Sequence, residues 1–135
     1  MASRVFIPLA VGLGSGTGGV LRYGLGGVFQ EAFPQSLVWG ILLANILGCF
    51  FIGVAGARYT RPNPPGGPIA AAFIIPGFCG GLTTVSLFSR QSLELWLSGD
   101  RFTFAILFLV SLLFCLLATY WGKHLFESKA SPENR

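Results

Sequence analysis

The chain alternates long apolar runs with short polar stretches, and four of the runs are long enough to cross a lipid bilayer. They occupy residues 5–29, 37–57, 68–97 and 102–122. A helix of about 20 apolar residues spans a hydrocarbon core of about 30 Å. The pattern therefore predicts an all-α membrane protein, with four transmembrane helices forming a single domain over residues 1–135.

The third run contains a stretch that makes a poor helix interior, GFCGGLTTVS at residues 77–86. Glycine costs about 1 kcal/mol relative to alanine inside a helix, so a break is expected here. A break frees backbone N–H and C=O groups, which in lipid must be satisfied by protein, water or an ion. Freed carbonyls suit a small hard cation, whereas freed N–H groups suit an anion. The stretch thus predicts an ion site of either sign at mid-membrane.

Polar side chains of two other runs lie at the depth of this break. Asn45 is two residues from the midpoint of its run, and Ser111 is adjacent to the midpoint of the last run. Polar groups are costly there unless they are paired, so these residues predict a shared site; the alternative is that each forms hydrogen bonds to its own helix or to a neighbouring one. Ser111, Cys115 and Thr119 share one helix face. This row indicates either a track for a ligand or close packing through small residues.

Composition and charge support a membrane protein and suggest its orientation. Of 135 residues, 53% are hydrophobic and 10% are charged, whereas soluble domains carry about a quarter charged residues. With four spans, both termini and the second loop lie on one side. The basic residues on that side are Arg4, Arg58, Arg61, Lys123, Lys129 and Arg135. The other side has Arg101, plus Arg22 and Arg90 if they extend toward it, so we expect both termini in the cytoplasm.

Three stretches of the chain resemble motifs of the Fluc/CrcB family of fluoride channels. GFCGGLTTVSLFS at residues 77–89 is similar to that family's GFCGGLTTFSTFS. GILLANILGCFFIG at 40–53 is similar to GTLxVNxxGSFxxG, and GSGTGGVLRYGLG at 14–26 is similar to GGxxGAxxRY. The resemblance implies four transmembrane helices, the third broken near its middle, and an antiparallel homodimer of dual topology in the cell (inner) membrane. Dual topology inserts the two copies in opposite orientations, whereas the charge bias by itself favours both termini in the cytoplasm.

The resemblance also implies a function and a cofactor. Members of the family are passive, fluoride-selective channels that export F⁻ from the cytoplasm through two pores along the dimer interface. A structural Na⁺ at the centre of the dimer is held by backbone carbonyls from both copies. On this chain those carbonyls would belong to Gly80 and Thr83. The expected partners are therefore fluoride, the lipid bilayer and a second copy of the chain, with no nucleic acid.

Pore-lining residues follow from the same motifs. Asn45 matches a pore asparagine whose amide donates to fluoride. Phe88 matches the second of two pore phenylalanines, whose ring edges carry the positive part of the quadrupole, and Val85 replaces the first. Arg22 matches the arginine of the first motif, which either raises the local anion concentration or extends to lipid headgroups. The other expected pore-lining residues are Thr84, Ser86, Ser111, Cys115 and Thr119.

Two alternative functions are considered. A small multidrug-type exporter also has four spans, but it needs a glutamate inside the first span, where the only charge is Arg22. A non-transporting membrane subunit is the other alternative, because Val85 and Leu87 replace the first phenylalanine and the threonine of the family motif. Phe50 or Phe51 could supply the ring edge that Val85 lacks. The cysteines lack the spacing of a metal or disulfide site. No nucleotide-binding loop and no carboxylate near mid-membrane are found in the sequence, which favours a passive pore over a coupled pump; the resemblance to a channel family implies that the chain is not an enzyme.

Overall fold

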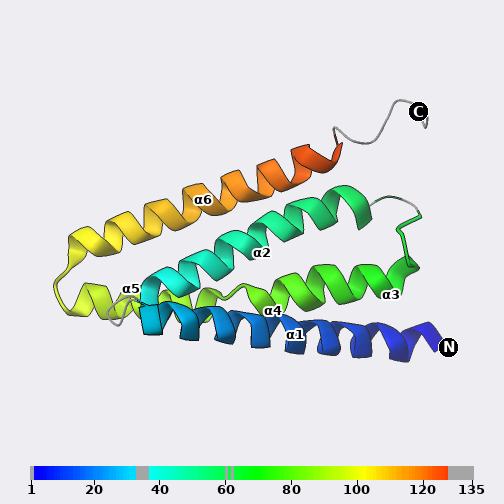
Figure 1. Ribbon diagram of the computed structural model, residues 1–135, viewed down its shortest axis with the longest axis horizontal. Helices are drawn as coiled ribbons and strands as arrows, with labels where there is room; N and C mark the ends of the chain where they lie inside the picture. Colours follow the sequence, from blue (N-terminus) through cyan, green and yellow to red (C-terminus); the bar gives the residue numbers. More distant parts are fainter. Residues whose placement is uncertain (1, 33–36, 60, 62, 128–135) are drawn as a thin grey trace.

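The computed structural model describes residues 2–32, 37–59, 61 and 63–127, which are helical apart from short connections (Figure 1). Four helical segments are long and apolar enough to cross a membrane. They are α1 (Ala2–Ala32), α2 (Leu37–Tyr59), a third segment within Gly67–Leu97, and α6 (Arg101–Glu127). In Figure 1, α1 begins and α6 ends at the same end of the molecule. The predicted all-α membrane fold with a broken third helix is confirmed.

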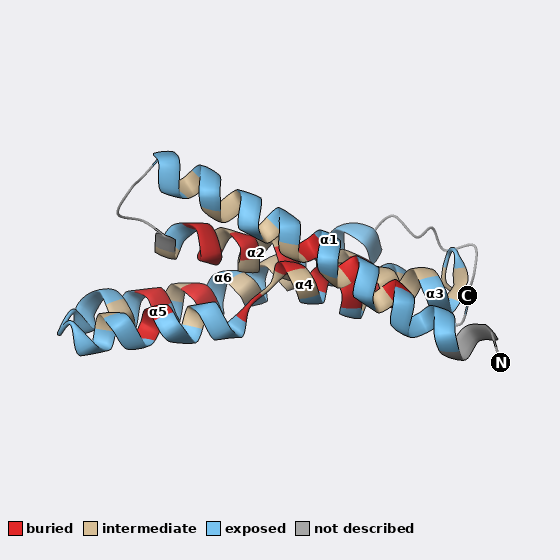
Figure 2. Ribbon diagram, turned by 90° about the horizontal axis from the view of Figure 1, so that it is seen from below, coloured by how far each residue is buried: buried red, intermediate tan, exposed pale blue. Residues whose placement is uncertain are grey.

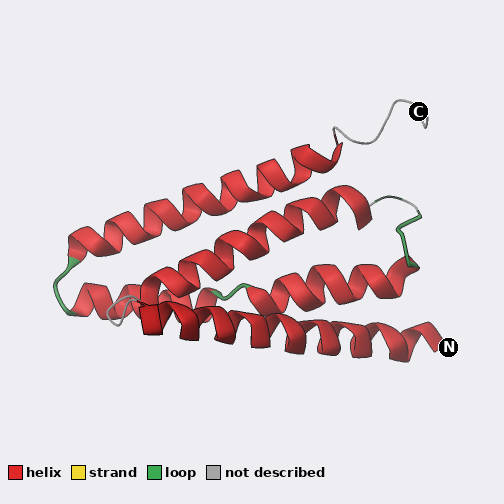
Figure 3. Cartoon of the chain, in the orientation of Figure 1, coloured by secondary structure: helices red, strands yellow, loops and turns green. Residues whose placement is uncertain are grey.

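The third segment consists of four helical pieces, α3 (Gly67–Ala72), the π-helical η1 (Phe73–Cys79), α4 (Gly80–Leu82) and α5 (Val85–Leu97). The sequence pattern did not reveal the π-helix. It contains Pro76, which has no N–H and would clash with the preceding turn of a regular α-helix, and a local π-turn is a known way to absorb this. The chain leaves the helix at Thr83 and Thr84, which are both extended, and Figure 3 shows the break as a loop.

The break falls just after the two glycines rather than at them. Gly80 has helical dihedral angles, φ −64° and ψ −37°, and Gly81 continues α4. A Cβ atom on Gly81 would collide with the backbone of Ser15 on α1. Gly81 therefore allows two helices to approach closely, while the neighbouring threonines interrupt the helix.

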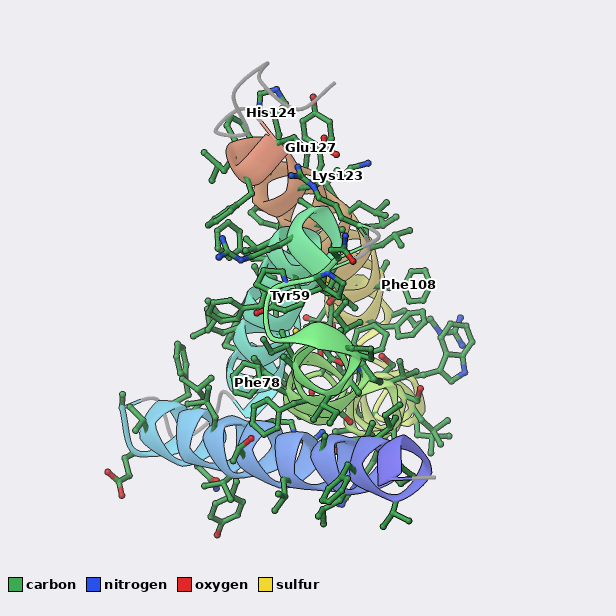
Figure 4. The ribbon with its side chains drawn as sticks, turned by 90° about the vertical axis from the view of Figure 1, so that its right-hand side faces the viewer. Tyr59, Phe78, Phe108, Lys123, His124 and Glu127 are labelled. Carbon is green, nitrogen blue, oxygen red and sulfur yellow. The ribbon has the colours of Figure 1, made fainter. Side chains whose placement is uncertain are left out.

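Helix α1 packs against the first half of the third segment, and in Figure 4 it crosses beneath the other helices. Gly14 and Gly18 make this contact, since a Cβ on either would meet backbone atoms of η1 or α4. The other glycines of this cluster, Gly12, Gly16 and Gly19, have open space around the Cβ position. Within the chain, therefore, only the glycines on one face of α1 are needed for close helix packing.

Helices α2 and α6 lie side by side along most of their length (Figure 1). Gly53 meets the backbone of Thr119, and Gly122 meets the carbonyl of Phe50, so small residues on both helices bring the backbones together. Helix α5 contacts α6 mainly through aromatic rings. Phe88 faces Phe108 with ring centroids 6.1 Å apart, and the Arg101 guanidinium lies 5.1 Å from the centre of the Trp96 ring.

The turn between α5 and α6 has its own local determinants. Gly99 has φ +84°, a left-handed conformation that glycine adopts without strain. The Asp100 carboxylate accepts a hydrogen bond of 3.1 Å from the Thr103 N–H and so caps α6. Hydrogen bonds from Thr103 hold the pKa of Asp100 below its ordinary value.

Burial is concentrated where the helices cross, and large apolar side chains are exposed over the rest of the surface (Figure 2). This distribution is typical of a chain surrounded by lipid. Two of the basic residues used to predict orientation, Lys129 and Arg135, lie outside the described residues. The Nε of Arg90 pairs with the Glu94 carboxylate at 2.8 Å, and both side chains are exposed.

Candidate ion site at the helix break

Asn45 of α2 forms two hydrogen bonds with the backbone of Thr84, a residue of the helix break. Its Nδ2 donates to the Thr84 carbonyl at 3.2 Å, and its Oδ1 accepts from the Thr84 N–H at 2.7 Å. The side chain therefore pairs with the extended backbone of Thr84 as a neighbouring strand would. The sequence placed Asn45 at the depth of the break but gave no sign of this pairing.

The break leaves the carbonyls of Gly80, in α4, and of Thr83, which follows α4, without their usual helical partners. In a continuous helix the Thr84 N–H would donate to the Gly80 carbonyl, but here it donates to Asn45. Likewise, the Leu87 N–H would donate to Thr83 but instead donates to the Thr84 hydroxyl at 3.3 Å, which caps α5. The break thus frees the two carbonyls that the sequence resemblance singled out.

Arg22 reaches this break from α1. Its Nη1 donates to the Thr83 carbonyl at 3.1 Å, and the residue is half-buried. The hydrogen bond places the guanidinium beside the break, so extension to lipid headgroups does not describe the residue in this structure. The sequence did not predict that Arg22 and Thr83 would meet.

An open pocket of about 260 Å³ lies beside the break, between α2, α5 and α6. Six of its lining residues were expected to line a pore. Its lining residues are Asn45, Thr84, Val85, Phe88, Phe108, Ser111, Leu112 and Cys115. Asn45 and Thr84 supply polar groups at the break, while Phe88 and Phe108 supply aromatic rings.

Phe108 is the notable lining residue that the sequence interpretation missed. Its ring, on α6, faces the ring of Phe88. Phe108 lines the same pocket as Val85, the residue that stands where the family motif has a phenylalanine. The spacing of Phe108 from Ser111 and Cys115, i, i+3 and i+7, was the available signal, because it places all three on one helix face. Phe51, which had been considered instead, packs against Phe78 with ring centroids 6.1 Å apart and does not line this pocket.

Three expected site residues lie outside the pocket lining. Arg22 contacts Thr83, as described above. The Ser86 hydroxyl lies 3.1 Å from the Thr84 hydroxyl on the exposed start of α5. Thr119 lines a different pocket further along α6, and its hydroxyl donates to the carbonyls of Cys49 and Cys115.

Ser111 is the polar group of this pocket that lacks a partner. The residue is 8% exposed, and its hydroxyl has no hydrogen bond within the part of the chain that the structure describes. The side-chain polar atoms of Gln91 and Ser92, on the buried face of α5, are unpaired in the same sense. Unpaired polar groups at membrane depth are costly, so the Ser111 hydroxyl is suited to donate to a ligand or water in the pocket.

The carbonyl oxygens at the break are suitable ligands for a hard cation such as Na⁺. Gly80 is exposed, its carbonyl has lost its helical donor, and such oxygens are the preferred ligands of hard cations. The Thr83 carbonyl has two lone pairs, of which Arg22 takes one, so one remains for a cation. The positive charge of Arg22 on this oxygen acts against the cation, which makes Gly80 the better of the two ligands.

Comparison with known proteins places these features in a family. A family model described as "CrcB-like protein, Camphor Resistance (CrcB)" matches residues 9–123. A protein of Campylobacter jejuni subsp. jejuni serotype O:23/36, named "Fluoride-specific ion channel FluC", is 36% identical over 119 residues, covering 88% of this chain and 96% of the relative. Proteins of the same name from Thiobacillus denitrificans and Rhodospirillum rubrum are 42% identical over 103 residues and 39% identical over 118 residues. These two alignments cover 72% and 84% of this chain, and 81% and 89% of the relatives.

Proposed function

Because the chain belongs to the CrcB family, and its relatives from Campylobacter jejuni and Thiobacillus denitrificans are named as fluoride-specific ion channels, we propose that it is a passive, fluoride-selective channel. It exports F⁻ from the cytoplasm through two pores along the interface of an antiparallel homodimer. The observation that carries the proposal is the pocket at the break, where an oriented amide, an unpaired buried hydroxyl and two aromatic rings converge. All of these groups can present positive character to an anion.

The orientation of the Asn45 amide supports an anion rather than a cation in this pocket. Its Oδ1 is occupied by the Thr84 N–H, which can only donate, so the hydrogen-bond network fixes which amide atom is the oxygen. Nδ2 carries two hydrogens, and one of them donates to the Thr84 carbonyl. The second hydrogen and the Ser111 hydroxyl are the donors that replace the water shell of fluoride.

The charges near the pocket favour a passive pore over a coupled transporter. None of the eight lining residues is an aspartate or a glutamate. Glu94, on α5, is exposed and paired with Arg90 in a surface ion pair. A proton-coupled exporter needs a membrane-embedded carboxylate that alternates between protonation states, and Glu94 is not placed for this role.

Fluoride efflux from proteoliposomes tests the proposal directly. Purified protein is reconstituted into vesicles loaded with KF, and a fluoride electrode follows efflux after a K⁺ ionophore is added. We expect rapid release of F⁻ and negligible release of Cl⁻ from matched KCl vesicles. Efflux no faster than from protein-free vesicles would reject the channel, and equal Cl⁻ release would reject its selectivity.

A Na⁺ ion held by the carbonyls of Gly80 and Thr83 from two copies completes the proposal and would link the copies. A ligand that binds only the folded dimer raises its stability. We therefore expect the thermal unfolding midpoint in detergent to be higher in NaCl than in N-methylglucamine chloride of equal ionic strength. Equal midpoints in the two salts would count against the cation site.

Val85→Phe tests the aromatic character of the pocket. Val85 lines the pocket and is 78% exposed in one copy of the chain, so within that copy a larger ring displaces no packed atoms. We expect fluoride efflux to be unchanged or faster, because a ring edge is added near the pocket. Phe108→Leu, which removes the ring already present, is expected to slow efflux several-fold. Slower efflux in Val85→Phe would show that an aromatic ring at this position obstructs the path.

A further inference from the structure

Two cysteines of the chain meet where α2 and α6 lie against each other. Cys49 belongs to α2 and Cys115 to α6, and their side chains are close enough to form a hydrogen bond. The Thr119 hydroxyl lies 3.1 Å from the Cys49 carbonyl oxygen and 3.0 Å from the Cys115 carbonyl oxygen. A hydroxyl has one hydrogen, so the two carbonyls share it, and the backbones of the two cysteines are held together.

This pair of thiols can be reached by a ligand. Cys49 and Cys115 each keep part of their surface exposed, and Cys115 lines the pocket of about 260 Å³ beside the break. Cys79, on η1, also lies near Cys49, but only 1% of its surface is exposed. The sequence could not reveal the pair, because the cysteines are far apart along the chain and belong to different helices.

Two thiols without further ligands suit a soft cation that needs only two. The described residues contain no group of three or more His, Cys, Asp or Glu side chains that could hold a metal ion. Structural Zn²⁺ takes four ligands, and Mg²⁺ and Ca²⁺ take oxygen ligands, so the pair suits none of these ions. Soft cations prefer thiolates, and among them Hg²⁺ binds two thiolates in a line.

Charge balance at membrane depth also favours a divalent cation. Binding of Hg²⁺ breaks the two S–H bonds, forms two S–Hg bonds and releases two protons, with no oxidation or reduction. The product of Hg²⁺ and two thiolates is neutral, whereas a monovalent cation on two thiolates leaves one negative charge. A net charge inside the membrane is costly, so the neutral product is the more stable one.

We propose that Cys49 and Cys115 form a two-coordinate binding site for Hg²⁺, which links α2 to α6 and narrows the pocket at the break. The site itself is independent of what the protein transports. Its effect on transport rests on the proposed function, so binding and transport are measured separately.

Retention of Hg²⁺ against a competing monothiol tests the site without any conduction. Purified protein in detergent is reduced with a phosphine, desalted, loaded with HgCl₂ and desalted again into N-acetylcysteine, and the bound mercury is measured by mass spectrometry. We expect Cys49→Ser and Cys115→Ser to lose the ion at several-fold lower N-acetylcysteine concentrations than the parent. Cys79→Ser is the matched control and should retain it. Equal retention in the parent and the two pair variants, or equal loss in Cys79→Ser, would overturn the site.

X-ray absorption at the mercury edge identifies the ligands directly. The Cys79→Ser variant contains only the two proposed ligands as cysteines, so two sulfur atoms bound to Hg²⁺ must come from this pair. We expect two sulfur ligands in the parent and in Cys79→Ser. A single sulfur ligand in both proteins would overturn the site, and the result in the parent does not depend on how well any variant folds.

Fluoride efflux from proteoliposomes tests whether the bound ion narrows the pocket. In N-acetylcysteine that strips the pair variants, we expect HgCl₂ to slow efflux several-fold in the parent and a dithiol chelator to restore it. Each pair variant, compared with its own rate before HgCl₂ is added, should be far less sensitive. Equal slowing in the parent and the pair variants would overturn the narrowing. A parent that does not conduct before HgCl₂ is added would reject the proposed function, whereas retention and X-ray absorption decide the site.

Discussion

Asn45→Asp is expected to abolish most fluoride efflux. The replacement keeps an oxygen to accept from the Thr84 N–H, but it loses the donor to the Thr84 carbonyl and places a second oxygen against it. It also puts a negative charge into a pocket that depends on donors. Repulsion between two unit charges about 4 Å apart costs about 4 kcal/mol at an effective dielectric constant of about 20, so the new carboxylate should slow fluoride efflux by roughly 100-fold or more.

Asn63→Asp is the matched control, because it makes the same chemical change at an exposed loop position. This variant should conduct as the parent does, which separates the local effect at the break from a change in net charge. Size-exclusion profiles of both variants establish that they assemble normally. Parental efflux in a well-assembled Asn45→Asp variant would show that neither the hydrogen bonds to Thr84 nor the amide donor is needed for conduction.

Gly81→Ala is expected to destabilise the protein although it adds a single methyl group. The new Cβ would collide with the Ser15 backbone, and backbone atoms at a helix crossing cannot rotate away as the end of a side chain can. Overpacking of this kind costs about 1–3 kcal/mol. We expect a lower thermal unfolding midpoint in detergent, with a larger aggregated fraction on size exclusion.

Gly80→Ala provides the contrast, since the residues are adjacent and belong to the same helix. A Cβ on Gly80 meets no atom within 4 Å in one copy of the chain. Alanine also favours the helix over glycine by about 0.5–1 kcal/mol, so this variant should be as stable as the parent or slightly more so. Equal damage from both substitutions would mean that the steric environment of Gly81 is not what distinguishes them.

The break shows how far local sequence signals reach. Low helix propensity in GFCGGLTTVS predicted an interrupted helix near the middle of the membrane, and the structure has one at Thr83 and Thr84. The glycine pair, however, remains helical. The missing Cβ atom lowers the helix propensity of glycine, but it also allows two helices to come into close contact. Only the position of Ser15 on another helix decides between the two roles for Gly81.

The pocket was predictable in outline, because the polar residues of three separate runs share one membrane depth. Asn45 and Ser111 do line it, together with residues of the broken helix. The hydrogen bonds of Asn45 to Thr84 and of Arg22 to Thr83 could not be predicted, since they depend on the rotation of each helix about its axis. Phe108 shares a helix face with Ser111 and Cys115, but this spacing alone does not distinguish it from the lipid-facing phenylalanines of the same run until its neighbours in space are known.

The dependence of the break on two other helices has a consequence for how the chain enters the membrane. The Thr84 N–H and carbonyl are satisfied by Asn45 of α2, and the Thr83 carbonyl is satisfied by Arg22 of α1; both helices are synthesised before the third segment. If the helices insert in order from the N-terminus, α1 and α2 are already in the membrane when the helix break of the third segment inserts. A circular permutant that begins at the third segment would present that stretch to the translocon without them, and it should integrate far less efficiently.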